Sequence, residues 1–125
     1  MAGETILIVD DNPMNMELAT DLLEAAGYVI RQAATAEDAI AAANTAPPQL
    51  ILMDLSLPGM DGLAATRALK ADPTTRAIPV IALTAHALQG DAVKTREAGC
   101  DRHLTKPVKK SLLLEVLKEY ERVIG

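Results

Sequence analysis

The chain has 125 residues, of which 50% are hydrophobic and only 2% aromatic, and its formal net charge is -5. This length predicts a single domain over residues 1–125, and an acidic balance without a long basic run argues against binding to DNA or RNA. The single cysteine excludes an internal disulfide. No apolar run is long enough to span a membrane, so we expect a cytoplasmic protein without membrane contact.

Short apolar runs alternate with helical patterns along the whole chain. The runs at residues 6–9, 50–53 and 80–83 indicate strands buried on both faces of a parallel sheet. A weaker strand is predicted at residues 28–33, and a short one is centred on Leu104. The expected fold class is therefore α/β, a doubly wound five-stranded parallel sheet with helices on both faces.

The first helix has clear signals at both ends. Asn12 is the predicted N-cap, Pro13 the first helical residue and Gly27 the terminator. We expect one apolar stripe along this helix, formed by Leu18, Ala19, Leu22, Leu23 and Ala26.

The remaining helices are predicted from caps and spacing. Thr35 caps the second helix with Asp38 as its capping-box partner, and this helix ends before Pro47. A third helix fits residues 63–70, and a fourth ends at Gly99. One side of the last helix is expected to carry Leu113, Leu117, Tyr120 and Ile124.

Polar residues follow the apolar runs where each strand ends. Asp10 and Asp11 follow the first run, and Asp54 follows the third. Thr84 follows the fourth run, and Lys106 follows the fifth strand. Because ligands bind beyond the carboxyl ends of the strands in an open parallel sheet, we expect these residues to converge on one surface.

These residue types suit phosphoryl transfer. Clustered carboxylates repel one another, and Mg²⁺ relieves the repulsion because it binds carboxylates together with phosphate oxygens. A threonine hydroxyl and a lysine ammonium group suit the oxygens of a phosphoryl group. The pattern predicts that Asp54 is the nucleophile and that Asp10 and Asp11 chelate the metal.

With these residues in place, the sequence resembles the response-regulator receiver domains of two-component signalling over essentially its whole length. The matching elements are Asp10-Asp11, residues 50–62, Thr84-Ala85 and Lys106-Pro107. Their order and their positions at strand ends make the resemblance specific. Finer detail is similar to DivK-type single-domain receivers and to the receivers of hybrid kinases, which favours a stand-alone response regulator.

The resemblance implies a Mg²⁺-dependent phosphorelay reaction. Asp54 would accept a phosphoryl group from a phosphohistidine on a sensor histidine kinase or a histidine phosphotransfer protein. Asp11, Asp54 and the backbone carbonyl of Ser56 would bind Mg²⁺ directly, and Asp10 would act mainly through water. The chain would catalyse its own phosphorylation and dephosphorylation without being a multiple-turnover enzyme.

The resemblance also implies a switch. Thr84 and Lys106 would contact the phosphoryl group, and the Lys106-Pro107 peptide bond would be cis. Thr84 would move together with an aromatic residue three positions before the lysine, but here that position is His103, which leaves the coupling intact, pH-sensitive or weakened. We expect a monomer that signals by phosphorylation-dependent binding to a downstream protein effector.

Other functions and roles stay open. A receiver fragment of a hybrid histidine kinase would look much the same, and a Mg²⁺-dependent aspartyl-phosphate phosphatase would need a general acid where Ser56 stands. A structural adaptor would gain nothing from clustered carboxylates. Met14 and Met16 suit partner docking or core packing, Gly62 is assigned to turn chemistry, and Cys100 to a buried position.

Overall fold

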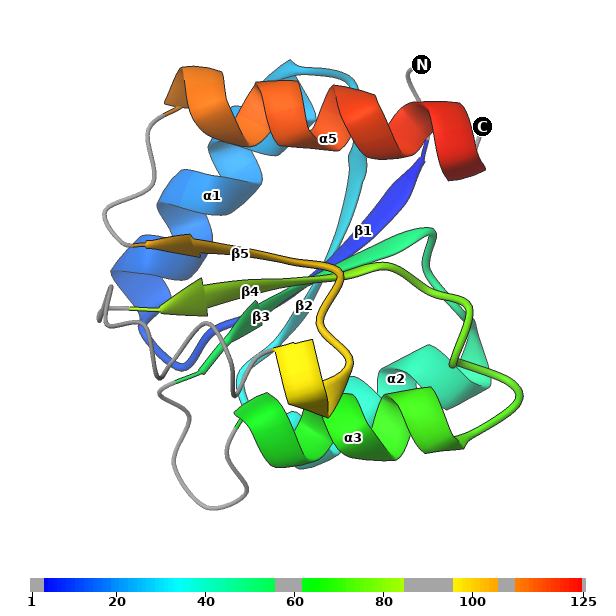
Figure 1. The fold of residues 1–125 in the computed structure, drawn as a ribbon. Coiled ribbons are helices and arrows are strands. Elements are labelled where there is room, and N and C mark those ends of the chain that lie inside the picture. The colour runs from blue at the N-terminus through cyan, green and yellow to red at the C-terminus, as the bar shows by residue number, and fades with distance from the viewer. Residues whose placement is uncertain (1–3, 56–61, 85–95, 106–109, 125) are drawn as a thin grey trace.

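Five parallel strands form one sheet in the order β2-β1-β3-β4-β5 (Figure 1). They are β1 (Thr5–Val9), β2 (Val29–Ala33), β3 (Leu50–Asp54), β4 (Val80–Thr84) and β5 (Arg102–Thr105). The computed structural model describes residues 4–55, 62–84, 96–105 and 110–124. Among these, residues 84, 105 and 120–124 are described by their backbone alone. The predicted five-stranded parallel sheet is confirmed.

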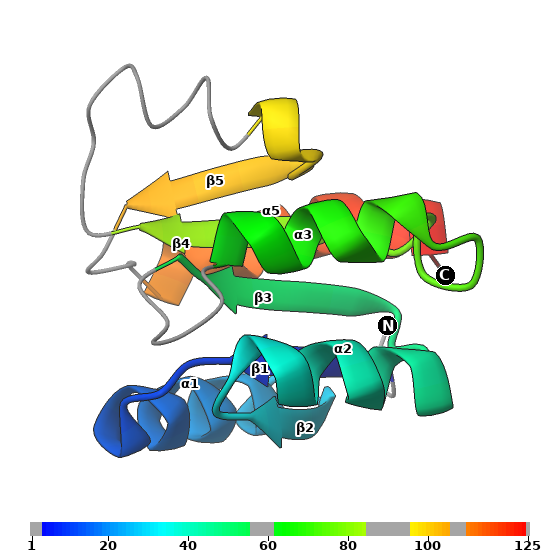
Figure 2. The same ribbon diagram turned by 90° about the horizontal axis from the view of Figure 1, so that it is seen from below.

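Helices cover both faces of this sheet. They are α1 (Pro13–Ala25), α2 (Ala36–Thr45), α3 (Gly62–Ala71) and α5 (Lys110–Ile124). Helices α1 and α5 lie on one face and α2 and α3 on the other (Figures 1 and 2). In the part of the chain that the structure describes, no helix is both long and apolar enough to cross a membrane.

The predicted helix ends agree with the backbone. Oδ1 of Asn12 accepts hydrogen bonds from the N–H groups of Met14 and Asn15 at 2.9 and 3.1 Å, and Pro13 opens α1. Gly27 follows α1 with a φ of 101°, a conformation that glycine adopts without steric cost. At α2, Oγ1 of Thr35 accepts from the N–H of Asp38 at 3.0 Å. The predicted fourth helix is seen only as a turn at residues 96–98, because its earlier residues lie outside those described.

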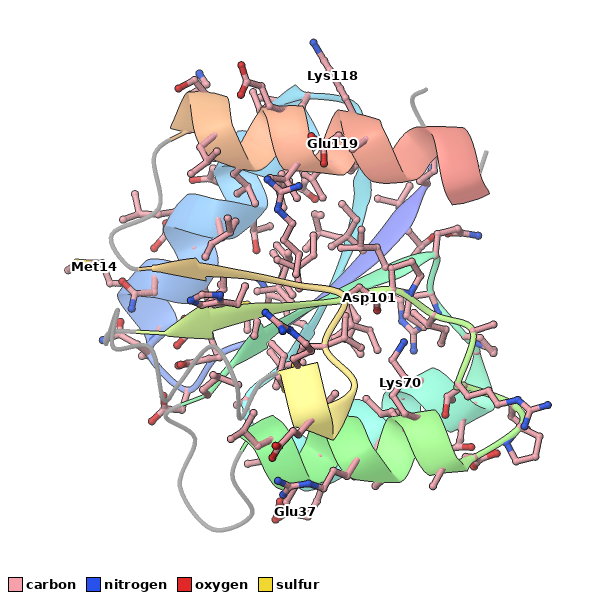
Figure 3. All side chains as sticks on the ribbon, viewed as in Figure 1. Met14, Glu37, Lys70, Asp101, Lys118 and Glu119 are labelled. Carbon is pink, nitrogen blue, oxygen red and sulfur yellow. The ribbon has the colours of Figure 1, made fainter. Side chains whose placement is uncertain are left out.

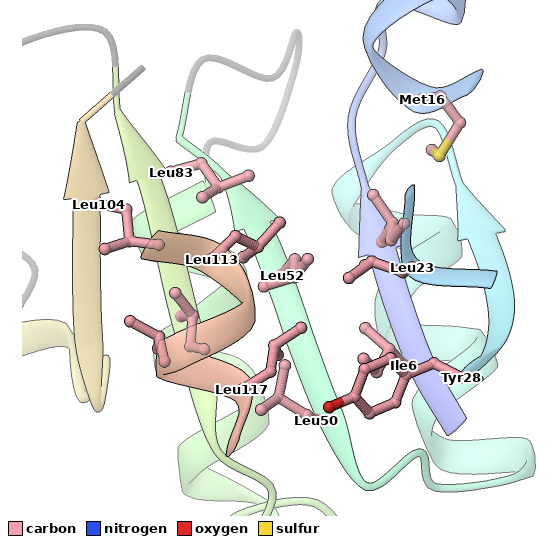
Figure 4. Close-up of a cluster of buried hydrophobic side chains, with 13 residues drawn as sticks. Ile6, Met16, Leu23, Tyr28, Leu50, Leu52, Leu83, Leu104, Leu113 and Leu117 are labelled. Carbon is pink, nitrogen blue, oxygen red and sulfur yellow. The ribbon is translucent and has the colours of Figure 1, made fainter. Parts of the chain in front are cut away.

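Two buried clusters hold the layers together, one on each face of the sheet. Side chains of β1, β3 and β4 alternate between them, as expected for strands buried on both faces. The cluster beneath α1 and α5 is drawn in Figure 4 and contains Ile6, Ile8, Met16, Leu23, Tyr28, Leu50, Leu52, Ile81, Leu83, Leu104, Leu113, Val116 and Leu117. The opposite cluster packs small α2 residues, Ala36, Ala39 and Ala43, against the sheet.

The predicted apolar stripe of α1 coincides only in part with the side of the helix that packs on the sheet. Met16 and Leu23 are buried in the core, whereas Leu18 is 63% exposed and Ala26 is also exposed. Residues 16 and 23 are seven positions apart and therefore lie on the same side of a helix, while residue 18 lies about 200° around the axis from residue 16. In α5, Leu113 and Leu117 are both buried, which agrees with their predicted place on one side of the helix, whereas the side chains of residues 120 and 124 lie outside those described.

Candidate functional site

Three aspartates meet at the carboxyl end of the sheet. Asp10, Asp11 and Asp54 each offer a carboxylate oxygen, and these oxygens lie within 4.8 Å of one another. Asp54 is only 2% exposed and Asp10 is buried, whereas Asp11 is exposed. The sheet order explains the meeting, because β1 and β3 are neighbours and Val9 pairs with Met53 directly before the two acidic positions. This is where the strand order reverses, the usual ligand site of such sheets.

The turn between β1 and α1 sets the directions of the first two aspartates. The N–H of Asp10 donates to the carbonyl of Ala33 at 3.1 Å, which extends the β1–β2 ladder by one bond. Oδ1 of Asp10 accepts from the N–H of Asn12 at 2.9 Å, and Asn12 then caps α1. The carboxylate of Asp10 is thereby held in a buried position at the end of the sheet, whereas Asp11 is exposed to solvent.

Asp54 is the last residue of β3, the central strand. Its neighbour Leu55 donates its N–H to the carbonyl of Leu83 at 3.0 Å, so the backbone is held on the β4 side beyond the last strand residue. On the other side, Gly62 at the start of α3 approaches so closely that a methyl group there would lie 2.5 Å from the carbonyl oxygen of Asp54. Gly62 was predicted to serve only a turn, and its contact with Asp54 was not predicted.

The other predicted site residues are described only in part. The backbone of Thr84 pairs with Thr105 at the carboxyl end of β4, one position beyond Leu83, the register partner of Asp54. The side chain of Thr84 lies outside the described residues, as do Ser56, Lys106 and Pro107, so the predicted cis peptide bond, carbonyl ligand and ammonium group fall there too.

His103 lies on β5, where it pairs with Ala82 two positions before the Thr84–Thr105 pair. The side chain is half-buried. His103 therefore lies on the strand next to β4, which ends at Thr84. The predicted coupling between His103 and Thr84 stays a prediction, because the side chain of Thr84 lies outside the described residues.

An exposed apolar pair lies in the first two turns of α1. Met14 is 70% exposed, and Leu18 lies four residues later on the same side of α1. Figure 3 shows Met14 at the margin of the molecule toward which the strands run. Met16 packs in the core, which confirms core packing for one of the two methionines, and partner docking by Met14 stays a prediction.

The donor set fits a hard divalent cation. All three groups are carboxylates, two are buried, and none of the ligand atoms is nitrogen or sulfur. Carboxylate oxygens without histidine or cysteine favour Mg²⁺ or Ca²⁺ over zinc. The arrangement can therefore hold a cation directly beside a buried carboxylate.

Residues 6–118 match the response regulator receiver domain family. The chain belongs to this family. It is 41% identical to the polar-differentiation response regulator DivK of Brucella ovis over 117 residues, which cover 94% of this chain and 95% of DivK. The structural neighbours are receivers as well, with the same CheY-like fold.

Two solved structures illustrate the likeness. The receiver domain of sensor histidine kinase PA1611 from Pseudomonas aeruginosa, which has a magnesium ion coordinated in its active-site cleft, is 39% identical with a TM-score of 0.88 and coverage of 95% of this chain and 98% of that one. The chemotaxis protein CheY4 of Vibrio cholerae is 26% identical with a TM-score of 0.90, covering 95% and 99%. Receivers of different output classes thus share this fold.

Proposed function

We propose that this receiver domain, a single domain over residues 1–125, is a stand-alone cytoplasmic response regulator of a two-component phosphorelay. Asp54 accepts a phosphoryl group from a phosphohistidine of a sensor histidine kinase or histidine phosphotransfer protein. The phosphorylated monomer then signals by binding a downstream protein effector. The observation that carries the proposal is the approach of Asp10 and Asp11 to the buried carboxylate of Asp54 within 4.8 Å.

Each aspartate has a separate role in the proposed reaction. Asp54, held by backbone bonds on a central strand, is the nucleophile that displaces the imidazole leaving group. Asp11 and Asp54 hold Mg²⁺ with the carbonyl of Ser56, and Asp10 contributes through water. Bound Mg²⁺ supplies positive charge to the transferring phosphoryl oxygens. Thr84 and Lys106 bind those oxygens by a hydroxyl hydrogen bond and a positive charge.

Burial supports the nucleophile assignment. Asp54 is the least exposed of the three carboxylates, so the phosphoryl group on it would be held partly within the sheet edge. Asp11 is exposed, so a cation bound to it can keep the water ligands that Mg²⁺ retains. Catalysis in such a site consists mainly of positioning and charge stabilisation.

The phosphoryl donor is proposed to dock on the exposed apolar pair of α1. Met14 and Leu18 lie within the first two turns of α1, which begins at Pro13, two residues after Asp11. An adaptable methionine beside a leucine suits contact with an amphipathic helix of a partner protein. A histidine carried by that helix would then reach the rim of the three aspartates.

Phosphorylation by a small donor tests the proposal. The purified protein is incubated with Mg²⁺ and acetyl phosphate, and intact mass is measured for the wild type, Asp54→Ala and the control Asp21→Ala, whose aspartate is exposed on α1. We expect one stable phosphoryl adduct in the wild type and in Asp21→Ala, and none in Asp54→Ala. Rapid phosphate release without an adduct would instead support a phosphatase, and no reaction with either this donor or a kinase would support an adaptor.

A receiver that forms part of a hybrid histidine kinase is the second candidate. The 39% identity to the receiver domain of PA1611, itself a part of a sensor histidine kinase, favours it specifically. The 41% identity to DivK, which is a response regulator, favours the first proposal. Immunoblotting of the protein in the source cells separates the two candidates, because a hybrid kinase that contains this receiver would migrate far above a protein of 125 residues.

A further inference from the structure

The first turn of α3 lies directly against the backbone of Asp54. A methyl group on Gly62 would come within 2.5 Å of the carbonyl oxygen of Asp54 and 2.9 Å of Cα of Leu55. Both are backbone atoms, which cannot swing away as the end of a flexible side chain can. A shift of Gly62 toward β3 would therefore displace the backbone at the end of that strand.

The same contact involves Leu55, the residue that follows Asp54. Leu55 and Gly62 flank residues 56–61, and the structure places these two flanking residues against each other. Leu55 is additionally held by its bond to Leu83 and by packing in the core cluster under α2 and α3. Gly62 therefore contacts the backbone on both sides of the peptide bond that follows Asp54, one of the proposed metal ligands.

Thr66 holds Gly62 in place. The side chain of Thr66 is fully buried, and its Oγ1 donates a hydrogen bond to the carbonyl of Gly62 at 2.8 Å. The same oxygen accepts a weak hydrogen bond from Sγ of Cys100 at 3.8 Å. The hydroxyl thus uses both its donor and its acceptor capacity, and it joins α3 to the segment that precedes β5.

Helix formation does not account for this hydroxyl. A threonine bonded to the carbonyl four residues earlier is neutral to slightly destabilising in a helix, and a buried apolar residue of the same shape would fill the site. A second threonine with the same features closes the other end of the helix: Thr75 is also fully buried, and its Oγ1 donates to the carbonyl of Leu69 at 2.6 Å. The two differ in that only Thr66 is bonded to the residue that contacts Asp54.

We infer that Thr66 is a positioning residue for the phosphoacceptor, acting through the carbonyl of Gly62 on the backbone of Asp54. The inference rests on the proposed function of Asp54. Without the hydroxyl, the first turn of α3 can shift relative to β3, and the Asp54 carboxylate moves with its backbone relative to Asp10 and Asp11. Small displacements matter because phosphoryl transfer depends on in-line placement of the nucleophile.

Three threonine variants test the inference. Thr66→Val removes the hydroxyl and keeps the shape, Thr66→Ser restores the hydroxyl, and Thr75→Val is the matched control at the far end of α3. Each is studied below its melting temperature, with folding checked by circular dichroism. The readouts are the Mg²⁺ dissociation constant from calorimetry and, from acetyl phosphate titrations, the maximal rate constant separately from the half-saturating donor concentration.

We expect Thr66→Val to lower the maximal phosphorylation rate constant about tenfold, in line with the cost of small misplacements. Mg²⁺ binding should weaken, and the half-saturating donor concentration should change little. Thr66→Ser should recover the wild-type values, and Thr75→Val should keep them while losing thermal stability. Gly62→Ala, if the variant folds, should lower the maximal rate constant and the Mg²⁺ affinity more than Thr66→Val does.

The outcomes separate the two proposals. Wild-type Mg²⁺ affinity and phosphorylation rate in Thr66→Val would overturn the positioning role, and so would an equal loss in Thr75→Val or no recovery in Thr66→Ser. A wild-type protein that binds Mg²⁺ but takes no phosphoryl group would refute the proposed function, while the Mg²⁺ affinities of the variants still decide whether Thr66 positions Asp54. A wild type that does neither would refute both.

Discussion

Nζ of Lys70 lies 3.0 Å from Oδ2 of Asp101, thirty-one residues away in the sequence (Figure 3). The same ammonium group donates to the backbone carbonyls of Arg76 at 3.2 Å and Ile78 at 2.7 Å, so its three donors are used. Oδ2 of Asp101 also accepts from the N–H of Val80 at 2.8 Å. This pair therefore connects the end of α3, the following loop, the start of β4 and the segment before β5.

Asp101→Ala should lower the free energy of unfolding by about 1–2 kcal/mol, measured by urea denaturation. The variant leaves the ammonium group of Lys70 and the N–H of Val80 without their shared acceptor, although partial exposure lets water replace some of the lost bonding. The control is Glu119→Gln in the Arg102–Glu119 pair, whose side chains are 41% and 57% exposed and which should contribute less than about 1 kcal/mol. Equal losses in the two variants would contradict the role assigned to Asp101.

Arg31 completes the C-terminal end of α2 from the neighbouring strand. Its guanidinium donates to the carbonyl of Ala42 at 2.9 Å and to the carbonyl of Ala46. Ala46 is the C-cap residue of α2, and the carbonyl of Ala42 in the last turn also accepts from the N–H of Ala46 at 3.1 Å. The guanidinium supplies the carbonyl at the helix C-terminus with a donor that the helix does not provide. Arg31→Ala should lower the free energy of unfolding by about 1–2 kcal/mol in urea denaturation.

Arg31→Lys separates charge from geometry in this cap. A lysine keeps the favourable charge near the helix C-terminus but lacks the planar fork that reaches two carbonyls, so it should recover only part of the loss. Arg67→Ala on the exposed side of α3 is the control and should change stability by less than about 0.5 kcal/mol. Full recovery by lysine would mean that charge alone accounts for the cap.

The strands, the caps and the meeting of the three aspartates could be predicted because their signals are local. An apolar run indicates a strand, and a strand end indicates one rim of a parallel sheet, so Asp10, Asp11 and Asp54 needed no knowledge of long-range packing. Asn12 and Thr35 cap their helices by bonds to residues two or three positions away, which the sequence shows directly.

Other features could not be predicted because they depend on tertiary packing. Met16 and Leu18 are similarly apolar, and only the rotation of α1 against the sheet decides that Met16 is buried. A glycine before a helix indicates a turn equally well whether or not it approaches Asp54, as Gly62 does. The Lys70–Asp101 pair joins residues with no local pattern between them.

Cys100 should react slowly with thiol reagents in the folded protein. Burial raises the pKa of its thiol, and the hydrogen bond to Thr66 offsets only part of that change. Since the thiolate is the nucleophile, iodoacetamide should modify the native protein more slowly than the urea-unfolded protein at the same pH. Glutathione measured in the same two solutions corrects for the effect of urea on the reagent.

The raised pKa of Cys100 also predicts a pH dependence of stability. The folded protein holds the thiol proton more tightly than the unfolded chain, whose thiol has a pKa of 9.0. This contribution to stability is therefore complete below pH 9.0 and is lost as the pH rises through the folded pKa. The difference in unfolding free energy between wild type and Cys100→Ala should decrease over that range, and a constant difference would show that the thiol titrates alike in both states.

Charge repulsion at the three aspartates should make the metal-free protein less stable than its Asp54→Asn variant. Asp54 and Asp10 are both buried, and with Asp11 they bring three carboxylates within 4.8 Å, so removing one charge relieves repulsion that the unfolded chain does not experience. We expect a rise of several degrees in melting temperature by calorimetry without divalent cations, because about 1 kcal/mol corresponds to roughly 4 °C in a domain of this size.

Added Mg²⁺ should raise the melting temperature of the wild type and have a smaller effect on Asp54→Asn. A cation at a hundred times its dissociation constant stabilises the folded state by about 2.7 kcal/mol, and the variant lacks one of the carboxylates that would bind it. Asp21→Asn, which removes an exposed charge outside the cluster, should match the wild type with and without Mg²⁺. If Asp21→Asn shifts the melting temperature as much as Asp54→Asn does, net charge and not local repulsion is the cause, because both variants change the charge of the chain equally.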